Sequence, residues 1–393
     1  MNPAALIPSA ESIPVAWGWF EVFKLSTFWI HLLLMNTVFG GAMFALINGT
    51  SSGAGPQLAK RLPTILALTV NLGVPPLLFL QVLYGQFLYS TAVLSAVYWM
   101  LLVALVMLAY GLLYVHAWRV KKASPGALSA LALPLAVCFL LATSFILTTI
   151  MSLMIRPEGW TQYFQNPHGT ILNLADPTFF PRWLHFVFAS MAVGGLFTAL
   201  LNFGAARRGD EAACRRTNVG MKWFTHISLM QIGIGLWWIM ALPSEVMLLF
   251  MGGSVPHTVA FLVALALVAT ALVLGFSGRV VPTTVTLVLT VLAMVVMRDL
   301  VRMASLAEYF HPSEMEVTGQ YGSMFLFLFS FAAVLVAIAY MLKLHRRAGG
   351  GYRSWSIRFG NFPRWLADSG SRSSPRRMSS SPISPWAAGC SWF

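Results

Sequence analysis

The sequence predicts an all-α integral membrane protein with about nine transmembrane helices, and its composition and charge pattern are the reasons. Of the 393 residues, 58% are hydrophobic and 9% are charged, whereas roughly a quarter of the residues in a soluble domain are charged. Nine stretches are apolar and long enough to cross a bilayer, which takes about 20 residues each. This composition excludes an ordinary soluble domain.

The nine predicted spans follow one another along most of the chain. They are residues 26–47, 64–89, 93–118, 127–154, 180–204, 222–243, 257–276, 281–302 and 320–343. Residues 1–25 form an outer N-terminal segment that lacks the basic region and the cleavage site of a signal peptide. Residues 349–393 are rich in Gly, Ser, Pro and Arg, which predicts a disordered basic cytoplasmic tail.

The net charge of +13 indicates the orientation of the chain in the membrane. Basic residues follow every second span: Lys60, Arg61, Arg119, Lys121, Lys122, Arg207, Arg208, Arg215, Arg216, Arg279, Lys343, Arg346 and Arg347. Short loops rich in Lys and Arg stay on the cytoplasmic side. We therefore expect an outer N-terminus and a cytoplasmic C-terminus. The charge needs no nucleic-acid partner to explain it.

Two of the spans share a motif. Residues 29–46 and 183–200 have Trp, His, two Gly, Ala and Leu in common at a constant offset of 154. A weaker echo, at an offset of 150, pairs Gln81 with Gln231 and Gly85 with Gly235.

An internal repeat follows from this motif. The copies are four spans apart, so they run in the same direction through the membrane. The sequence predicts two parallel-repeat four-helix bundles, residues 26–154 and 180–302, with 320–343 as a peripheral helix. The repeated glycines, Gly40 with Gly41 and Gly194 with Gly195, predict close packing of helices.

The two repeated histidines, His31 and His185, are the strongest candidates for a functional site. An ionisable residue inside a span is costly and is by default a functional candidate. Neutral imidazole is a common axial ligand of haem iron, and the absence of a CxxCH motif excludes covalent c-type haem. The alternative is a histidine that hydrogen-bonds a neighbouring helix. The repetition favours haem b, with His31 and His185 as iron ligands.

Three arginines lie in the same predicted outer layer. Arg182 precedes His185 by one helical turn, and Arg298 and Arg302 are spaced by one turn in the eighth span. Planar guanidinium groups suit carboxylates, and two haems would bring four propionates to this layer. The alternative is an arginine that extends to lipid headgroups.

Other polar residues suggest secondary sites. His116 and His226 lie near the predicted cytoplasmic ends of their spans and are candidates for an inner haem, or are solvated histidines. Gln81, Tyr84 and Gln86 in the second span predict a quinol pocket, or are ordinary residues of the membrane interface.

The chain resembles a known family in the region around His185. The segments 160–168, which begins with Trp160 and ends with His168, and 177–190 are similar to the fourth-to-fifth helix region of subunit I of cytochrome bd quinol oxidases. The resemblance extends from about Phe28 to Met240. It implies that His185 ligates a low-spin b haem and His31 a second b haem, in a prokaryotic inner membrane and beside partner subunits of a respiratory complex.

The chain also departs from that family. The connection 244–256 is short where the family has a long quinol-binding loop, residues 257–276 contain no methionine, and no Gly-Arg-Gln-Pro-Trp sequence occurs. Between Glu21 and Glu158 there is no acidic residue, although oxygen reduction needs protons at the haem.

The sequence therefore predicts a membrane electron-transfer subunit with b-type haem that oxidises quinol and passes electrons to a partner redox protein. Two alternatives stay open. One is a bd-type quinol:oxygen oxidoreductase subunit I. The other is a haem-free transporter or structural subunit, which is disfavoured because Pro75-Pro76 predicts a break in the second span without a counterpart in the sixth.

Overall fold

The computed structural model describes residues 3–122 and 127–351, which are helical apart from their connections and one isolated bridge between Ile13 and Val317. The chain divides into two units, Met1–Val317 and a second that begins at Thr318. Each unit is described by itself.

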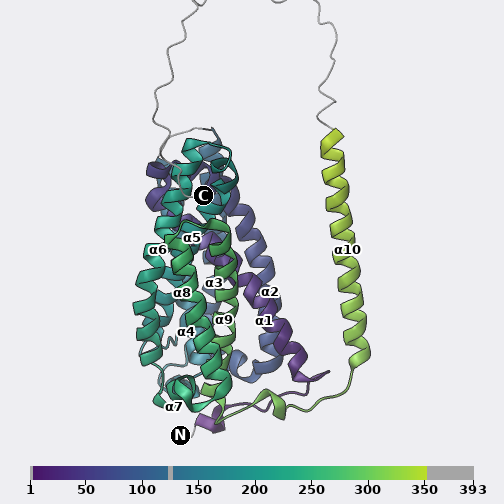
Figure 1. Ribbon diagram of the computed structural model, residues 1–393. Coiled ribbons are helices and arrows are strands. Elements are labelled where there is room, and N and C mark those ends of the chain that lie inside the picture. The colour runs from purple at the N-terminus through teal and green to yellow at the C-terminus, as the bar shows by residue number, and fades with distance from the viewer. Residues whose placement is uncertain (1–2, 123–126, 352–393) are drawn as a thin grey trace, which may run out of the picture. The chain divides into compact units, whose positions relative to one another are not determined.

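The first unit is a bundle of long helices joined by short connections (Figure 1). Its α-helices are α1 (Trp17–Ser52), α2 (Gly55–Leu94), α3 (Ala96–Lys122), α4 (Ala127–Met154), α5 (Phe179–Ala206), α6 (Glu211–Met240), α7 (Ser244–Leu248), α8 (Val255–Phe276) and α9 (Val280–Leu306). Four short helical segments lie between or before them: η1 (Pro3–Leu6), η2 (Pro157–Phe164), η3 (Leu249–Gly253) and η4 (Pro312–Glu314).

The described residues contain eight helices that are long and apolar enough to cross a membrane. Helix α6 makes a ninth only when it is taken together with Ser244–Gly253, which follows it across a bend of 119°. Multiple spans are therefore confirmed, at eight or nine. The sixth span ends earlier than predicted, at Met240, because Pro243 disfavours helical backbone at the residue before it.

The second helix differs from its prediction. Helix α2 is continuous through Pro63, Pro75 and Pro76, and its only non-helical residue is Tyr84 (φ −136°, ψ 32°). The predicted break at Pro75-Pro76 is therefore wrong. A proline removes one backbone donor and bends a helix, but neighbouring helices in a bundle can hold the bent segment in place.

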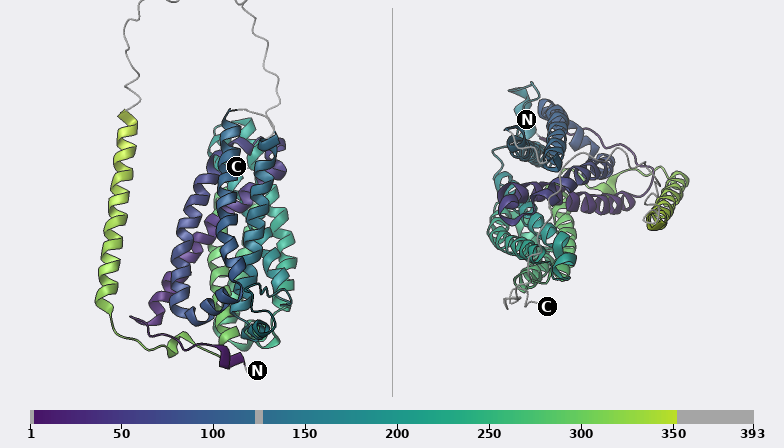
Figure 2. Two further views of the ribbon diagram at one scale, coloured as in Figure 1. Left: turned by 180° about the vertical axis from the view of Figure 1, so that it is seen from behind. Right: turned by 90° about the horizontal axis from the view of Figure 1, so that it is seen from above.

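The helix pairs with the most extensive contact are α5 with α6, α1 with α2, α1 with α5, α3 with α4, and α8 with α9. Smaller contacts join α2 to α3, α6 to α8, α1 to α9 and α4 to α5. Figure 2 shows, from behind and from above, that these helices run along one common direction. Helices α1 and α5 therefore lie at the centre of the contacts.

Helices α1 and α5 meet through backbone at their glycines. A Cβ added to Gly40 would lie 1.6 Å from the carbonyl oxygen of Ser190, and one added to Gly194 would lie 2.1 Å from that of Gly40. Nearby, the Ser190 hydroxyl donates a hydrogen bond of 2.7 Å to Oδ1 of Asn36. The pairs Gly40–Gly194 and Asn36–Ser190 share the offset of 154, so α1 and α5 run parallel. We call the end at which they begin the proximal end.

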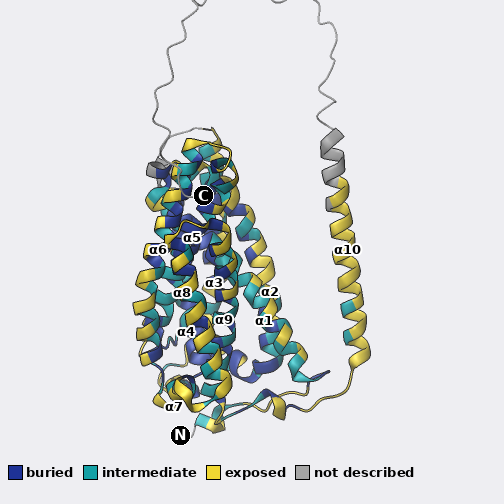
Figure 3. Cartoon of the chain, in the orientation of Figure 1, coloured by how far each residue is buried: buried dark blue, intermediate teal, exposed yellow. Residues whose placement is uncertain are grey.

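The burial pattern is that of a membrane protein. Inner faces of the helices are buried and outward faces are exposed (Figure 3). The exposed side chains include many large apolar ones, such as Val103, Met107 and Val273. An apolar exterior of this kind is stable only against lipid, so contact with membrane lipid follows.

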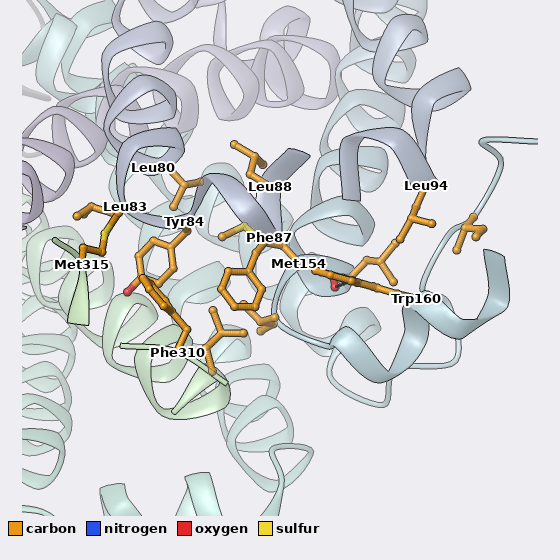
Figure 4. Close-up of a cluster of buried hydrophobic side chains, with 14 of the residues drawn as sticks. Leu80, Leu83, Tyr84, Phe87, Leu88, Leu94, Met154, Trp160, Phe310 and Met315 are labelled. Atoms are coloured by element: carbon orange, nitrogen blue, oxygen red, sulfur yellow. Dashed lines mark hydrogen bonds between the residues drawn. The ribbon is translucent and has the colours of Figure 1, made fainter. Parts of the chain in front are cut away.

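An aromatic cluster closes the proximal end of the first unit. Side chains from the end of α2, from η2 and from the segment after α9 meet there, among them Tyr84, Phe87, Trp160 and Phe310 (Figure 4). Trp160 also donates a hydrogen bond of 3.0 Å from Nε1 to the carbonyl of Leu153. The cluster holds these connections on the bundle.

In the second unit the structure describes one long helix, α10 (Tyr321–Gly351). Its segment Tyr321–Met341 is apolar enough to span a membrane, as predicted for residues 320–343. The predicted disordered tail begins at Gly349, but Gly349–Gly351 are helical. Residues 352–393 lie outside the described part.

Candidate functional site

His31 lies on α1 and faces α2. Its Nδ1 is 2.9 Å from the carbonyl oxygen of Thr69. A carbonyl only accepts, so Nδ1 carries the proton and Nε2 keeps its lone pair. A Cβ added to Gly73 would lie 2.7 Å from Cε1 of His31. The glycine is therefore required for the ring to reach this position.

His185 lies on α5 and faces α6. The side-chain amide of Gln231 donates to Nε2 of His185 at 3.1 Å and approaches the His185 carbonyl at 3.3 Å. Among the described residues, Nδ1 of His185 is buried without a hydrogen-bond partner. A Cβ added to Gly235 would lie 3.5 Å from Cε1 of the ring. Each histidine thus faces a glycine on the next helix.

These contacts correct the predicted alignment of α2 with α6. His31 meets Thr69 and Gly73, whereas His185 meets Gln231 and Gly235. Their offset is 162, since 231 − 69 and 235 − 73 both give that number. The weak similarity at an offset of 150 therefore does not align the residues of α2 and α6 that contact the two histidines. Thr69 contacts His31 through its backbone carbonyl and Gln231 contacts His185 through its side-chain amide, so the residue types carry no signal for this pairing.

The tryptophan two residues before each histidine fixes the helix to a partner. Trp29 donates from Nε1 to the carbonyl of Val288 on α9 at 3.0 Å. Trp183 donates from Nε1 to the hydroxyl of Ser144 on α4, also at 3.0 Å. These bonds explain why the repeated motif contains Trp as well as His.

A guanidinium group lies one helical turn before each histidine. Arg182 donates to Oγ1 of Thr178 at 2.9 Å. The equivalent position on α1, by the offset of 154, is Phe28, and Arg298 of α9 lies over its ring at 4.8 Å from the centroid. Both repeats therefore have a guanidinium group one turn before the histidine. In α5 it belongs to the same helix, and at α1 it comes from α9.

The three predicted arginines meet at one cavity. It has a volume of about 30 Å³ and is lined by Met151, Met154, Ile155, Arg182, Trp238, Arg298, Val301 and Arg302. Nε1 of Trp238 is buried without a hydrogen-bond partner among the described residues. The sequence did not single out Trp238, because tryptophan is common at membrane interfaces.

A network of buried charges joins α1 to α9 beside this cavity. Nζ of Lys24 lies 2.7 Å from Oε2 of Glu21 and 2.7 Å from Oδ1 of Asp299. Arg302 donates to the same Asp299 oxygen. The Tyr84 ring has Lys24 at 5.2 Å and Arg302 at 5.5 Å from its centroid.

The sequence did not predict this network. Residues 1–25 were expected to precede the first span, but α1 begins at Trp17. Glu21 and Lys24 are therefore part of a bundle helix. Glu21 and Lys24 made this segment less apolar in the sequence. In the structure Lys24 pairs with Glu21 and with Asp299 of α9.

A polar cluster fixes the start of α5. Asp176 accepts hydrogen bonds from the Ser152 hydroxyl, from the Thr178 backbone N–H at 3.0 Å and from the Thr178 hydroxyl at 2.8 Å. Burial acts to raise the pKa of Asp176, but these hydrogen bonds and the charge of Arg182 outweigh it, so the pKa lies below its ordinary value. The anchored Thr178 in turn accepts from Arg182.

The remaining predicted residues do not form one site. Tyr84 and Gln86 are buried and Gln81 is half-buried, and none of the three lines a cavity described here. The Tyr84 hydroxyl has no hydrogen-bond partner within the described chain.

His116 lies on α3 and His226 lies on α6. These two helices are not in extensive contact with each other. His116 is half-buried. His226 is exposed, with Nδ1 2.6 Å from the carbonyl of Lys222 in its own helix. A shared inner site for these two histidines stays a prediction.

Within residues 3–122 and 127–351, no three His, Cys, Asp or Glu side chains converge as a metal site. Neither the protein-family models nor the curated proteins include a match to this chain. Sequence and structure together thus show a multi-pass, all-helical membrane protein. In it, each of the two repeated histidines contacts the helix that follows its own.

Proposed function

We propose that this protein is a b-type haem electron-transfer subunit of a membrane complex, with His31 and His185 each ligating one haem. One observation carries the proposal. Two histidines at equivalent positions each face a glycine on the next helix and have a guanidinium group one turn away. A histidine that only hydrogen-bonds a neighbouring helix gives no reason for these features to occur twice.

The proposed architecture is a pair of parallel four-helix bundles, with α1 to α4 equivalent to α5, α6, α8 and α9, and α10 as the peripheral helix. The packing supports this arrangement. The contacts α1–α2, α2–α3 and α3–α4 recur as α5–α6, α6–α8 and α8–α9, and α1–α9 recurs as α5–α4. The offset contacts at Gly40 and at Asn36 then lie on the axis between the bundles.

The residues present fit a haem by their chemistry. The Thr69 carbonyl holds the Nδ1–H tautomer of His31 and leaves Nε2 for the metal, the usual arrangement of a ligating histidine. At His185, Nε2 accepts from the Gln231 amide, so Nδ1, which has no partner among the described residues, carries the proton. Gln231 must release Nε2 before this nitrogen can ligate iron. A porphyrin supplies four nitrogens, so one or two protein ligands suffice, and a cluster of three is not needed.

Haem binding also requires the helices to adjust. The cavity beside Arg182 measures about 30 Å³, and a second cavity, lined by Thr69, Phe186 and mostly apolar neighbours, measures about 60 Å³. Pockets for small ligands begin at roughly 300 Å³. Side chains around His185 must therefore move when the macrocycle enters. Two methionines, Met151 and Met154, line the cavity beside Arg182, and their flexible side chains suit such a change.

When bound, the haem iron would supply reversible one-electron transfer. The protein's own residues do the rest. His31 and His185 bind from α1 and α5, and Arg182 and Arg298 offer charge to the propionates. Apolar side chains such as Phe39 and Phe186, which stack at 5.7 Å between α1 and α5, exclude water from the bundle centre.

Membrane quinol is the electron donor that we propose. Its oxidation releases protons, and the ionisable groups of the helices that could take them gather at the proximal end, in the network of Glu21, Lys24 and Asp299. The predicted pocket residues Gln81 and Tyr84 belong to the same end, since Lys24 lies over the Tyr84 ring.

The transporter alternative is not favoured. Helix α2 is interrupted at Tyr84 and α6 is followed by the bend of 119°, so the asymmetry expected from Pro75-Pro76 does not exist. Both interruptions fall near helix ends, however, whereas broken helices of transporters place their sites near the midplane.

The purified complex with its native partners tests the proposal. It should oxidise a short-chain quinol when an acceptor other than oxygen is supplied, and His185→Ala should abolish this activity and remove one low-spin haem. His168→Ala, in an exposed loop, is the control. Unchanged haem content in His185→Ala would refute the assignment of His185 as a haem ligand. Rapid, cyanide-tolerant oxygen consumption with quinol alone would favour the terminal oxidase instead.

A further inference from the structure

The polar side chains that line the cavity between α4, α5, α6 and α9 are all hydrogen-bond donors. Its polar side chains are Arg182, Arg298, Arg302 and Trp238, and its other lining residues are Met151, Met154, Ile155 and Val301. Guanidinium and indole groups donate and do not accept. The thioethers of the two methionines are weak acceptors at best.

The charges around the cavity do not balance. Five cations, Lys24, Arg156, Arg182, Arg298 and Arg302, face three carboxylates, Glu21, Asp176 and Asp299. Asp299 is shared by Lys24 and Arg302, and Asp176 lies 3.8 Å from Arg156. The surplus belongs to Arg182 and Arg298. In the described chain, neither has a carboxylate within ion-pair distance: Arg182 donates to a hydroxyl and Arg298 lies over a phenyl ring.

The cavity also contains a donor without an acceptor, the indole N–H of Trp238. Nε1 of Trp238 is buried without a partner among the described residues, and a buried donor without an acceptor is destabilising. Two guanidinium groups on one cavity, neither in an ion pair with a carboxylate, also repel each other in a medium of low dielectric. An oxyanion placed between them would satisfy all of these groups together.

We infer that this cavity binds an oxyanion, a carboxylate or a phosphate, carried by an amphiphile in the membrane. The donors lie near helix ends at the proximal end, which is the depth of headgroups and not of acyl chains. The cavity of about 30 Å³ accommodates the charged group only, so the hydrocarbon part of the same molecule lies outside it. The donor set requires this chemistry whether or not haem binds at His185.

Two sources have this chemistry: the phosphate of an anionic phospholipid and a propionate of the proposed haem. The first arm of the test titrates delipidated protein in detergent with phosphatidylglycerol and with phosphatidylcholine, and follows thermal stability. A phospholipid ligand predicts stabilisation by phosphatidylglycerol alone. Its apparent affinity should fall about tenfold or more in Arg298→Gln, since one charge-assisted bond contributes roughly 1.5–3 kcal/mol.

The second arm compares binding of haem b with binding of its dimethyl ester, in which the propionates are uncharged. A propionate ligand predicts that wild-type protein prefers the free acid and that Arg298→Gln loses the preference. Trp238→Phe keeps the ring and removes the donor, so it should weaken the same ligand even if Arg298→Gln does not fold. Arg279→Gln, at an exposed position outside the cavity, is the matched control.

The source is the ligand, phosphatidylglycerol or free-acid haem, that the wild-type protein prefers and for which Arg298→Gln loses the preference. A failure of haem to bind at all would remove the haem proposal and leave the lipid arm intact. If neither phosphatidylglycerol nor the free propionates are preferred by wild-type protein, or if Arg298→Gln and Trp238→Phe keep the wild-type preference, the cavity is not an oxyanion site.

Discussion

At the scale of single residues, Gly40 and Gly194 set the distance between the central helices. Each meets the backbone of the other helix, with room for a hydrogen and for nothing larger. The repeated Gly-Gly pair predicted this packing, and the structure confirms it. Two backbones in contact also bring the histidines of α1 and α5 into one bundle, so the glycines support the site without touching it.

Gly40→Ala and Gly194→Ala should each lower the melting temperature in detergent by several degrees. The added methyl group would have to displace the carbonyl of Ser190 or of Gly40, and overpacking of a tight core costs about 1–3 kcal/mol. The control is Gly233→Ala, where a Cβ meets nothing within 4 Å. A control as destabilised as Gly40→Ala would show that helix–helix contact is not the cause.

Asp176 gives a pH dependence with a defined sign. Its pKa is lower in the folded protein than in the unfolded chain because Ser152 and Thr178 hydrogen-bond the carboxylate, which outweighs burial. The stability it contributes is present above the unfolded pKa of about 3.9 and is lost as the pH falls through the folded pKa. Wild-type protein should therefore lose more stability than Asp176→Asn on acidification from pH 6 to pH 3. Equal losses in the two proteins would contradict the role of Asp176.

Residue identity alone predicted some members of the site and missed others. His31, His185 and the three arginines stood out because charged or ionisable groups are rare in spans, and the structure does bring Arg182, Arg298 and Arg302 to one cavity. Trp238, Gln231 and Lys24 did not stand out. Their importance depends on which helices meet, and a sequence without homologues does not show that.

At the scale of elements, the helices were predictable and their ends were less so. Long apolar runs define α1 to α5, α8 and α9, because a span requires them. The start of α1 at Trp17 and the interruption at Tyr84 depend on tertiary contacts: Lys24 pairs with Asp299 of α9, and Tyr84 packs in the aromatic cluster. Local sequence carries little information about such contacts.

Lys24→Met should destabilise the contact between α1 and α9. Lys24 is shared by Glu21 and Asp299 at 2.7 Å each, and removing one partner of a buried ion pair costs about 3–5 kcal/mol because a charge is left uncompensated. In Lys24→Met that charge is Glu21, since Asp299 keeps Arg302. The double variant Glu21→Gln with Lys24→Met should recover part of the loss in thermal unfolding. A double variant less stable than Lys24→Met alone would show that Glu21 is not the stranded charge.

At the scale of the whole molecule, the charge pattern predicts how the protein sits in the membrane. Reporter tags placed after Lys122 and after Lys343 should be cytoplasmic, and a tag near Asn166 should be outside. The physical reason is the retention of basic loops on the cytoplasmic side. Tags after Lys122 and near Asn166 on the same side would contradict the number of spans between them.

The haem content of the purified protein tests the central claim most directly. A reduced-minus-oxidised visible spectrum, quantified by pyridine haemochrome, should show b-type haem at two or more per chain. His31→Ala and His185→Ala should each lose one equivalent, because the matched histidines are the proposed ligands of separate haems. A protein that folds, inserts and carries no haem would contradict the account and leave a transporter or structural subunit as its function.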